Sequence, residues 1–232
     1  MKADRFTGSG FAAVMLAAAL ALGGCASAPK EHFHTLASSE GAAPPANNVA
    51  AAAAAAAANR EAGRTRMPAT AADYYVEVTA VNVPPQVNRN QLVVSTGGGR
   101  VEVLEQQRWA SPLAGEIGRA LSLGITTELG VIDVFRTPYP AKSVVYRVST
   151  NVQRFESTPG QHALLDVVWS VRQVGASGEA LSTCRSVIEE SVSPGYDALV
   201  AGHAQAVRRL SAAVATTIRS MQAGLTPVCG AA

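Results

Sequence analysis

A short apolar run near the start of the chain determines which part of the sequence can fold as a domain. Residues 11–22 (FAAVMLAAALAL) are uncharged and apolar, and they follow the basic residues Lys2 and Arg5. As a helix, this run would span roughly 18 Å, too short for the roughly 30 Å hydrocarbon core of a bilayer. A basic start followed by a short apolar segment and small residues is typical of a secretory signal. We therefore expect export, with the folded part beginning later.

The sequence Leu22-Gly23-Gly24-Cys25 gives the cleavage site. It resembles the lipobox of bacterial lipoproteins, in which a dedicated peptidase cuts before a cysteine that carries a diacylglycerol. We predict that residues 1–24 are a signal peptide that is removed, and that Cys25 carries two or three acyl chains, palmitate among them. One chain alone holds a protein only marginally, so this number implies stable anchoring. The alternative is an ordinary signal peptide with an incidental cysteine.

The residue after the lipidated cysteine bears on the choice of membrane. Many Gram-negative lipoproteins that stay in the inner membrane have Asp at this place, whereas this chain has Ala26. The lipobox resemblance therefore implies a lipid anchor in the outer membrane, with the protein facing the periplasm.

The mature chain has the size and composition of one exported domain. Removal of residues 1–24 from the 232 would leave 208, enough for a single core. The formal net charge of +2 is nearly balanced and, like export, argues against nucleic acid as a partner. In an oxidising compartment Cys184 and Cys229 are expected to form a disulfide; the alternative is two buried free thiols.

Composition divides the mature chain into three parts. Residues 25–36 hold the anchor, a short tether and a candidate first strand. Residues 37–72 are an Ala-rich, low-complexity loop or linker without an apolar stripe to bury, and residues 73–232 form the domain. If residues 32–36 pair into a sheet, the tether from Cys25 spans at most about 20 Å. If they do not, the Ala-rich stretch joins the tether, which then has a coil dimension of roughly 35–40 Å.

Hydrophobic periodicity predicts strands, a helix, more strands and a second helix. Apolar residues alternate with polar ones after Asp73, and a glycine turn joins two short strands at 91–95 and 100–105. Helical spacing runs from a Ser111 cap, with Pro112 first in the helix, to near Gly130. A short strand at 131–135, an antiparallel meander over 144–191 and a helix at about 195–221 follow. The expected fold class is α/β (α+β): a mixed, mainly antiparallel sheet with two helices packed on one face.

The order of these motifs resembles a known family. Behind the lipobox come Phe33-His34-Thr35-Leu36, then Val83-Pro84-Pro85, then Gln91-Leu92-Val93-Val94 with a glycine turn to Val101-Glu102-Val103, and then Arg108-Trp109-Ala110-Ser111-Pro112-Leu113. Over residues 31–36 and 73–222 the chain is similar to the paraquat-inducible protein C (PqiC) family, the ABC-type transport auxiliary lipoproteins. The Ala-rich insert at 37–72 departs from the family pattern.

This resemblance implies a role without chemistry of its own. Such lipoproteins accompany inner-membrane complexes whose MCE-domain proteins bridge the periplasm and move lipids or other hydrophobic molecules. The expected role is an accessory or docking subunit that binds an MCE-domain protein, self-associates as a homo-oligomer and maintains the envelope. The alternative is a periplasmic lipoprotein that carries a lipid or solute in its own apolar pocket.

Candidate functional residues are few. His32 and His34 lie on one face of a strand, but two ligands without a third are too few for a metal site. The sequence contains no Gly-x-Ser-x-Gly and no His-Glu-x-x-His, so we expect no catalytic residues, no metal and no cofactor beyond the acyl chains on Cys25. His203 lies on the apolar stripe of the last helix and is expected to be a partly buried helix residue. Trp109 with Arg108 is a candidate partner contact; the alternative for Trp109 is a core anchor.

Overall fold

The computed structural model describes residues 29–37, 74–175 and 180–230. The signal peptide, Cys25 and nearly all of the Ala-rich segment at 37–72 lie outside these residues. The compact unit of the chain is Glu31–Ala232.

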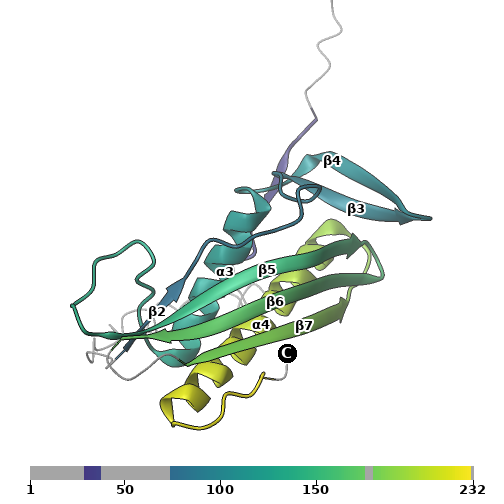
Figure 1. Ribbon diagram of the computed structural model, residues 1–232. Coiled ribbons are helices and arrows are strands. Elements are labelled where there is room, and N and C mark those ends of the chain that lie inside the picture. The colour runs from purple at the N-terminus through teal and green to yellow at the C-terminus, as the bar shows by residue number, and fades with distance from the viewer. Residues whose placement is uncertain (1–28, 38–73, 176–179, 231–232) are drawn as a thin grey trace, which may run out of the picture. The chain divides into compact units, whose positions relative to one another are not determined.

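The larger sheet has four strands in the order β2-β5-β6-β7 (Figure 1). Strands β5, β6 and β7 form the antiparallel meander that the alternating pattern predicts, and β2 pairs with β5 in parallel. Every second residue along β7 is buried up to Ile188, because one face of the sheet packs on the core. The strands are β2 (Tyr74–Val78), β5 (Val144–Thr158), β6 (His162–Val174) and β7 (Leu181–Ser191).

The smaller sheet has three strands in the order β1-β4-β3, where β1 is His32–His34, β3 is Gln91–Gly97 and β4 is Arg100–Trp109. Strands β3 and β4 form the predicted hairpin, and the residues at its tip, Gly98 and Gly99, have positive φ angles of 60° and 74° that favour glycine. Strand β1 pairs in parallel with β4, with Phe33 opposite Arg108. The segment 32–34 therefore does pair into a sheet.

The predicted fold class is confirmed, although the strands divide into two sheets instead of one. After β2 the chain follows β5 only as far as a bridge between Asn82 and Asn151. Pro84 and Pro85 follow, and proline has no N–H for a ladder. The hairpin that comes next therefore pairs with β1 and not with β5.

Helices α3 (Leu113–Leu129) and α4 (Tyr196–Gln222) cover the same face of the four-stranded sheet (Figure 1). Both bury the apolar stripe that the sequence predicts. None of the helices that the structure describes is both long enough and apolar enough to cross a membrane. The fully buried side chains between the helices and the sheet include Ile117, Leu121, Leu165, Trp169, Ile188, Leu210 and Ile218.

Two local predictions are wrong. Pro112 is the N-cap of α3 and not its first residue, because the Ser111 hydroxyl donates to the carboxylate of Glu116 instead of capping the helix. Residues 131–135 form one parallel bridge, between Val76 and Asp133, and no strand. The Asp133 carboxylate accepts hydrogen bonds from the backbone N–H groups of Val78 and Phe135, which replace a longer ladder.

A glycine on the stripe of α3 allows the two helices to approach closely. A Cβ atom at Gly124 would lie 2.6 Å from Ser211 Cβ on α4. We expect Gly124→Ala to lower the free energy of unfolding by about 2 kcal/mol, because overpacking must push the helices apart. Urea denaturation followed by circular dichroism measures this change.

Gly118 on the same helix is the matched control. A Cβ atom there would meet Val81 Cγ2 at 3.6 Å, an ordinary contact. Gly118→Ala is expected to stabilise the protein by up to about 1 kcal/mol through helix propensity. Equal effects of the two substitutions would rule out the close contact as the cause.

Candidate functional site

The structure places the predicted site residues in different surroundings. Cys25 lies outside the described residues. Cys184 and Cys229 form a disulfide that joins β7 to the tail after α4, with their Cα atoms 5.7 Å apart. The expected bridge is therefore present.

Trp109 and Arg108 are neighbours at the end of β4, but the Trp109 side chain is buried in the core and the Arg108 side chain is at the surface. Trp109 is 2% exposed, and its ring meets Phe155 edge to face at 6.2 Å. Of its two interpretations, the structure supports the core anchor. The Arg108 guanidinium is at the surface, 3.5 Å from the Glu31 carboxylate, and it donates from Nε to the backbone oxygen of Glu105. Arg108 therefore contacts the residue directly before β1.

His32 and His34 share strand β1, whereas His162 begins β6 and His203 lies on α4. His34 Nε2 lies 2.8 Å from Gln107 Oε1 and its Nδ1 is 3.7 Å from Asp197, whereas His162 is 3.3 Å from Thr158 Oγ1. No group of three or more His, Cys, Asp or Glu side chains within the described ranges could hold a metal ion.

A buried carboxylate ties the N-terminal segment to α3. Glu116 is fully buried, and its Oε2 accepts hydrogen bonds from Thr35 Oγ1 at 2.8 Å and from the Leu36 backbone N–H at 3.1 Å. Its Oε1 accepts from Ser111 Oγ at 2.7 Å and from Arg119 Nη2. We call these five residues the anchor clamp, because they hold the residues just after β1, which is the first strand that the chain enters after Cys25.

The anchor clamp was not found from the sequence. One signal was present: Glu116 lies three residues after Leu113 and next to Ile117, on the apolar stripe of α3, where a charged side chain needs buried partners. Its partners at positions 35 and 36 are about eighty residues away in sequence. Helical periodicity therefore indicates the burial of Glu116 and leaves its partners unidentified.

The clamp keeps Glu116 ionised. Burial alone would raise the pKa of this carboxyl, but hydrogen bonds from Ser111, Thr35 and the Leu36 backbone, together with the charge of Arg119, lower its pKa below the ordinary value of 4.5. Because the pKa is lower in the folded state, the stabilisation is complete above about pH 4.5 and is lost as the pH falls through the folded value. The clamp is therefore fully formed at neutral pH.

We expect Glu116→Ala to lower the free energy of unfolding by about 3 kcal/mol, because it leaves the Thr35 hydroxyl and the buried Leu36 N–H without an acceptor. Urea denaturation at pH 7 measures the loss. Glu128→Ala is the matched control on the same helix; its exposed ion pair with Arg219 contributes at most about 1 kcal/mol. A loss at Glu116 no larger than at Glu128 would contradict the clamp.

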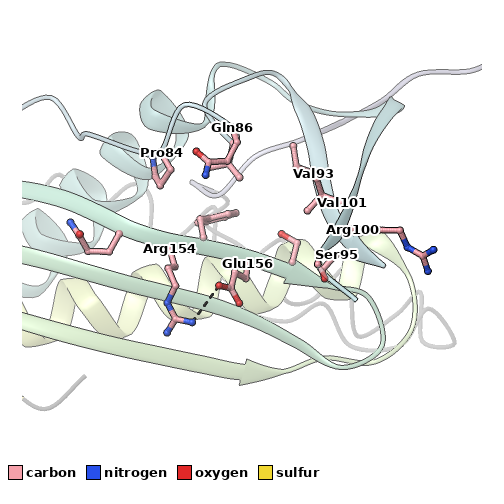
Figure 2. A pocket seen from close by; sticks show the side chains of 13 residues that line it. Pro84, Gln86, Val93, Ser95, Arg100, Val101, Arg154 and Glu156 are labelled. Carbon is pink, nitrogen blue, oxygen red and sulfur yellow. Dashed lines mark hydrogen bonds and ion pairs between the residues drawn. The ribbon is translucent and has the colours of Figure 1, made fainter. Parts of the chain in front are cut away.

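A surface hollow of about 380 Å³ lies between the β3–β4 hairpin and β5 (Figure 2). We call it the hairpin hollow. Val93, Ser95 and Val101 line its hairpin side, and Pro84 and Gln86 line it from the loop after β2. Residues 153–157 of β5 form the remaining side, where Arg154 Nη1 pairs with Glu156 Oε1 at 3.3 Å. The lining is apolar in part, with charged groups at the rim.

A buried histidine lies behind the hollow. His203 Nε2 is 2.8 Å from the hydroxyl of Ser157, a lining residue, and its ring stacks on Phe155 at 3.9 Å. Burial, and to a smaller extent the nearby His162, lowers the pKa of His203 to about 3. Nδ1 has no hydrogen-bond partner within the described part of the chain. A group with this pKa stays neutral and is a weak base at neutral pH, so the pair is suited to packing more than to proton transfer.

Comparison with protein families gives one extended match. The model of a family described as "ABC-type transport auxiliary lipoprotein component" matches residues 59–215. These residues include both helices except the end of α4, the hairpin, the meander and the hairpin hollow. No curated protein matches the chain significantly.

Several solved structures are similar to the chain, among them the following two. A crystal structure described as an uncharacterized protein aligns with a TM-score of 0.54 and 22% sequence identity, covering 63% of this chain and 92% of that one. Protein XCC0632 from Xanthomonas campestris, described with the DUF330 family, aligns with a TM-score of 0.48 and 16% identity, covering 65% and 87%. At these identities the first likeness concerns the fold alone, and the second carries no argument.

Proposed function

Because the chain belongs to the family of ABC-type transport auxiliary lipoproteins, we propose that it is the docking subunit of an MCE-type ABC transport system, held in the outer membrane by lipid on Cys25. In this role it binds an MCE-domain protein and helps lipids or other hydrophobic molecules to cross the periplasm. The family match over residues 59–215 carries the proposal. It confirms the resemblance inferred from the motifs and assigns the chain to transport systems; the partner, the cargo and the membrane are our inference.

The pairing of β1 supports a docking role. It leaves residues 26–31 between Cys25 and the first strand, a tether that reaches at most about 20 Å. The long-tether alternative does not apply, because β1 fixes the chain before the Ala-rich segment begins. An acylated Cys25 would therefore keep the domain close to its membrane, where a protein that bridges the periplasm must end.

The anchor clamp supports the same role. Leu36 is buried in the core, and Glu116 binds its backbone N–H and the Thr35 hydroxyl. A three-residue strand alone would be a weak attachment. With the clamp, a pull on the lipid anchor is resisted by the core of the domain.

The carrier alternative has one supporting feature, the apolar side of the hairpin hollow. The space between the four-stranded sheet and the helices is filled by fully buried side chains such as Leu165, Leu210 and Ile218. A carried lipid would therefore have to bind in the hollow at the surface. Native mass spectrometry of the purified lipoprotein would detect such a lipid.

The docking proposal is tested by purifying the tagged lipoprotein from gently crosslinked, detergent-solubilised envelopes. We expect an MCE-domain protein in the eluate, and copies of the lipoprotein crosslinked to each other. The control is Cys25→Ser, which removes the site of lipidation and is expected to release the chain from the membrane fraction and reduce recovery of the partner. Recovery of the lipoprotein with lipid alone would contradict docking and favour the carrier.

A further inference from the structure

One edge of β5 is paired along only part of its length. Strand β5 has 15 residues, and β2 pairs with its first five, 144–148. The chain after β2 continues along this edge through backbone hydrogen bonds to Thr150 and Val152, both made with Asn82. Within the ranges that the structure describes, the only backbone hydrogen bond to residues 153–158 from outside β6 is the turn bond from the Gln161 N–H to the Thr158 oxygen.

Peptide groups of the unpaired part face the hollow, although their residues are largely buried: Phe155 is 6% exposed and Ser157 4%. On the side of β5 that faces β2, the backbone C=O groups of Val148 and Thr150 accept hydrogen bonds and the backbone N–H of Val152 donates one. Up to Val152, even-numbered residues direct their backbone groups to this side. An irregularity in the pairing with β6 between Val152 and Arg154 shifts the alternation by one residue, so that beyond it odd-numbered residues do so. Because residues of an antiparallel strand face its two neighbours in turn, the N–H and C=O groups of Phe155 and Ser157 are directed to the open edge.

The hairpin hollow lies at this open edge. Residues 153–157 form one of its sides, and the hairpin faces them with Val93 and Val101 (Figure 2). Val101 is 66% exposed, a large value for a valine in a strand. The site therefore combines unpaired peptide groups with an apolar wall, the two features by which a sheet edge accepts an extended peptide.

The charges at the rim favour one kind of peptide. Arg154 is bound to Glu156 and to the buried Asp166, so its charge is balanced. Arg100 lies at the rim near the hairpin tip and has no ion pair within the described ranges (Figure 2). Its unbalanced charge is complementary to an acidic side chain.

We propose that the hairpin hollow receives an extended, acidic segment of a partner protein, which adds to β5 as a strand beside Phe155 and Ser157. Apolar side chains of the segment contact Val93 and Val101, and an acidic one pairs with Arg100. A hydrocarbon chain would fill the same space without satisfying the peptide groups, which is why a peptide fits better than a lipid tail. This inference deepens the docking role and rests on it only for the identity of the partner.

The test uses peptides and needs no natural partner. The lipidated chain in detergent micelles is titrated with a soluble peptide in which Val and Thr alternate around one Asp. We expect amide hydrogen exchange at Phe155 and Ser157, followed by NMR, to slow by about tenfold at saturation. The same peptide with every second amide N-methylated cannot pair as a strand and is expected to leave both exchange rates unchanged.

Variants locate the site. Val101→Asp and Arg100→Glu are expected to weaken peptide binding by about tenfold, because each places a negative charge against an acidic segment. Val187→Asp on β7, where the valine is 54% exposed, and Arg136→Glu in the loop after α3 are matched controls with no expected change.

Three results would overturn the inference: no slowing at either amide, equal slowing by the N-methylated peptide, or slowing by phosphatidylglycerol vesicles but not by peptide. Failure of the docking proposal alone would give a different result. The peptide would still bind, but the crosslinked envelopes would yield no MCE-domain protein.

Discussion

Removal of the Cys184–Cys229 disulfide is expected to lower the free energy of unfolding by about 4 kcal/mol, because the bridge restricts the unfolded chain over a separation of 45 residues. The double variant Cys184→Ala/Cys229→Ala tests this while leaving Cys25 for lipidation. Urea denaturation at pH 7 in detergent gives the free energies. A loss of this size is a large part of the stability of an ordinary domain.

The location of the bridge explains why the effect concerns the whole domain. Cys184 is buried on β7 opposite Trp169, in the centre of the core, and Cys229 belongs to the tail after α4. The tail is also held by a hydrogen bond from Thr217 Oγ1 to the backbone oxygen of Val228. The bridge therefore closes the chain around α4 and fixes that helix to the sheet.

A reducing agent provides the control. Dithiothreitol is expected to bring the wild-type protein to the stability of the double variant and to leave the double variant unchanged. Equal midpoints of the oxidised and reduced wild-type protein would contradict the prediction. A further loss in the double variant under reduction would point to another cause.

The elements that the sequence predicts are those whose signal is local. The alternation along Val144, Tyr146 and Val148 needs only neighbouring residues to be recognised, and the same holds for the stripe of α4. The glycine turn between β3 and β4 likewise joins neighbours in the chain. These elements are formed where the pattern places them.

The features that the sequence does not predict depend on distant pairs. Strand β1 finds its partner at Arg108, more than seventy residues away, and no periodicity specifies such a contact. The partners of Glu116 and the hairpin hollow are missed for the same reason, because both are made by segments that meet only in the folded chain.

Strand β4 connects the two sites that the proposals use. One edge of β4 carries β1, which leads to Cys25, and the other carries β3, which lines the hairpin hollow. If both proposals hold, the membrane anchor acts on this small sheet through β1, and the docked segment contacts it at Val93 and Val101 while pairing with β5. A force between membrane and partner would then pass through β4 as well as through the anchor clamp and the core.

The stability of the protein is expected to fall steeply with acid, starting near pH 6.5, because of His203. Its side chain is 1% exposed, and burial, with the nearby His162, lowers its pKa from the ordinary 6.5 to about 3. The unfolded chain therefore binds a proton at this histidine between about pH 6.5 and pH 3, and the folded chain does not. Stability is complete above pH 6.5 and decreases by about 1.4 kcal/mol per pH unit below it.

The carboxyls of Asp166 and Glu116 titrate in a lower range. Hydrogen bonds from Arg185 lower the pKa of Asp166 below its ordinary 3.8, against the opposing effect of burial, and the clamp lowers that of Glu116 below 4.5. Because both carboxyls bind protons less readily in the folded state, their stabilisation is present above those ordinary values and is lost below them. The range from pH 6.5 to pH 5 therefore separates the effect of His203 from theirs.

Urea denaturation at pH 7 and pH 5 is expected to show a loss of about 2 kcal/mol in the wild-type protein. His203→Gln, which does not titrate, is expected to be less stable at pH 7, because it loses the stacking on Phe155, but to have nearly equal stability at both values. His162→Gln keeps His203 and should retain the pH dependence. A wild-type protein equally stable at pH 7 and pH 5, or a His203→Gln variant with an unchanged pH dependence, would show that this histidine is not what makes the fold sensitive to acid.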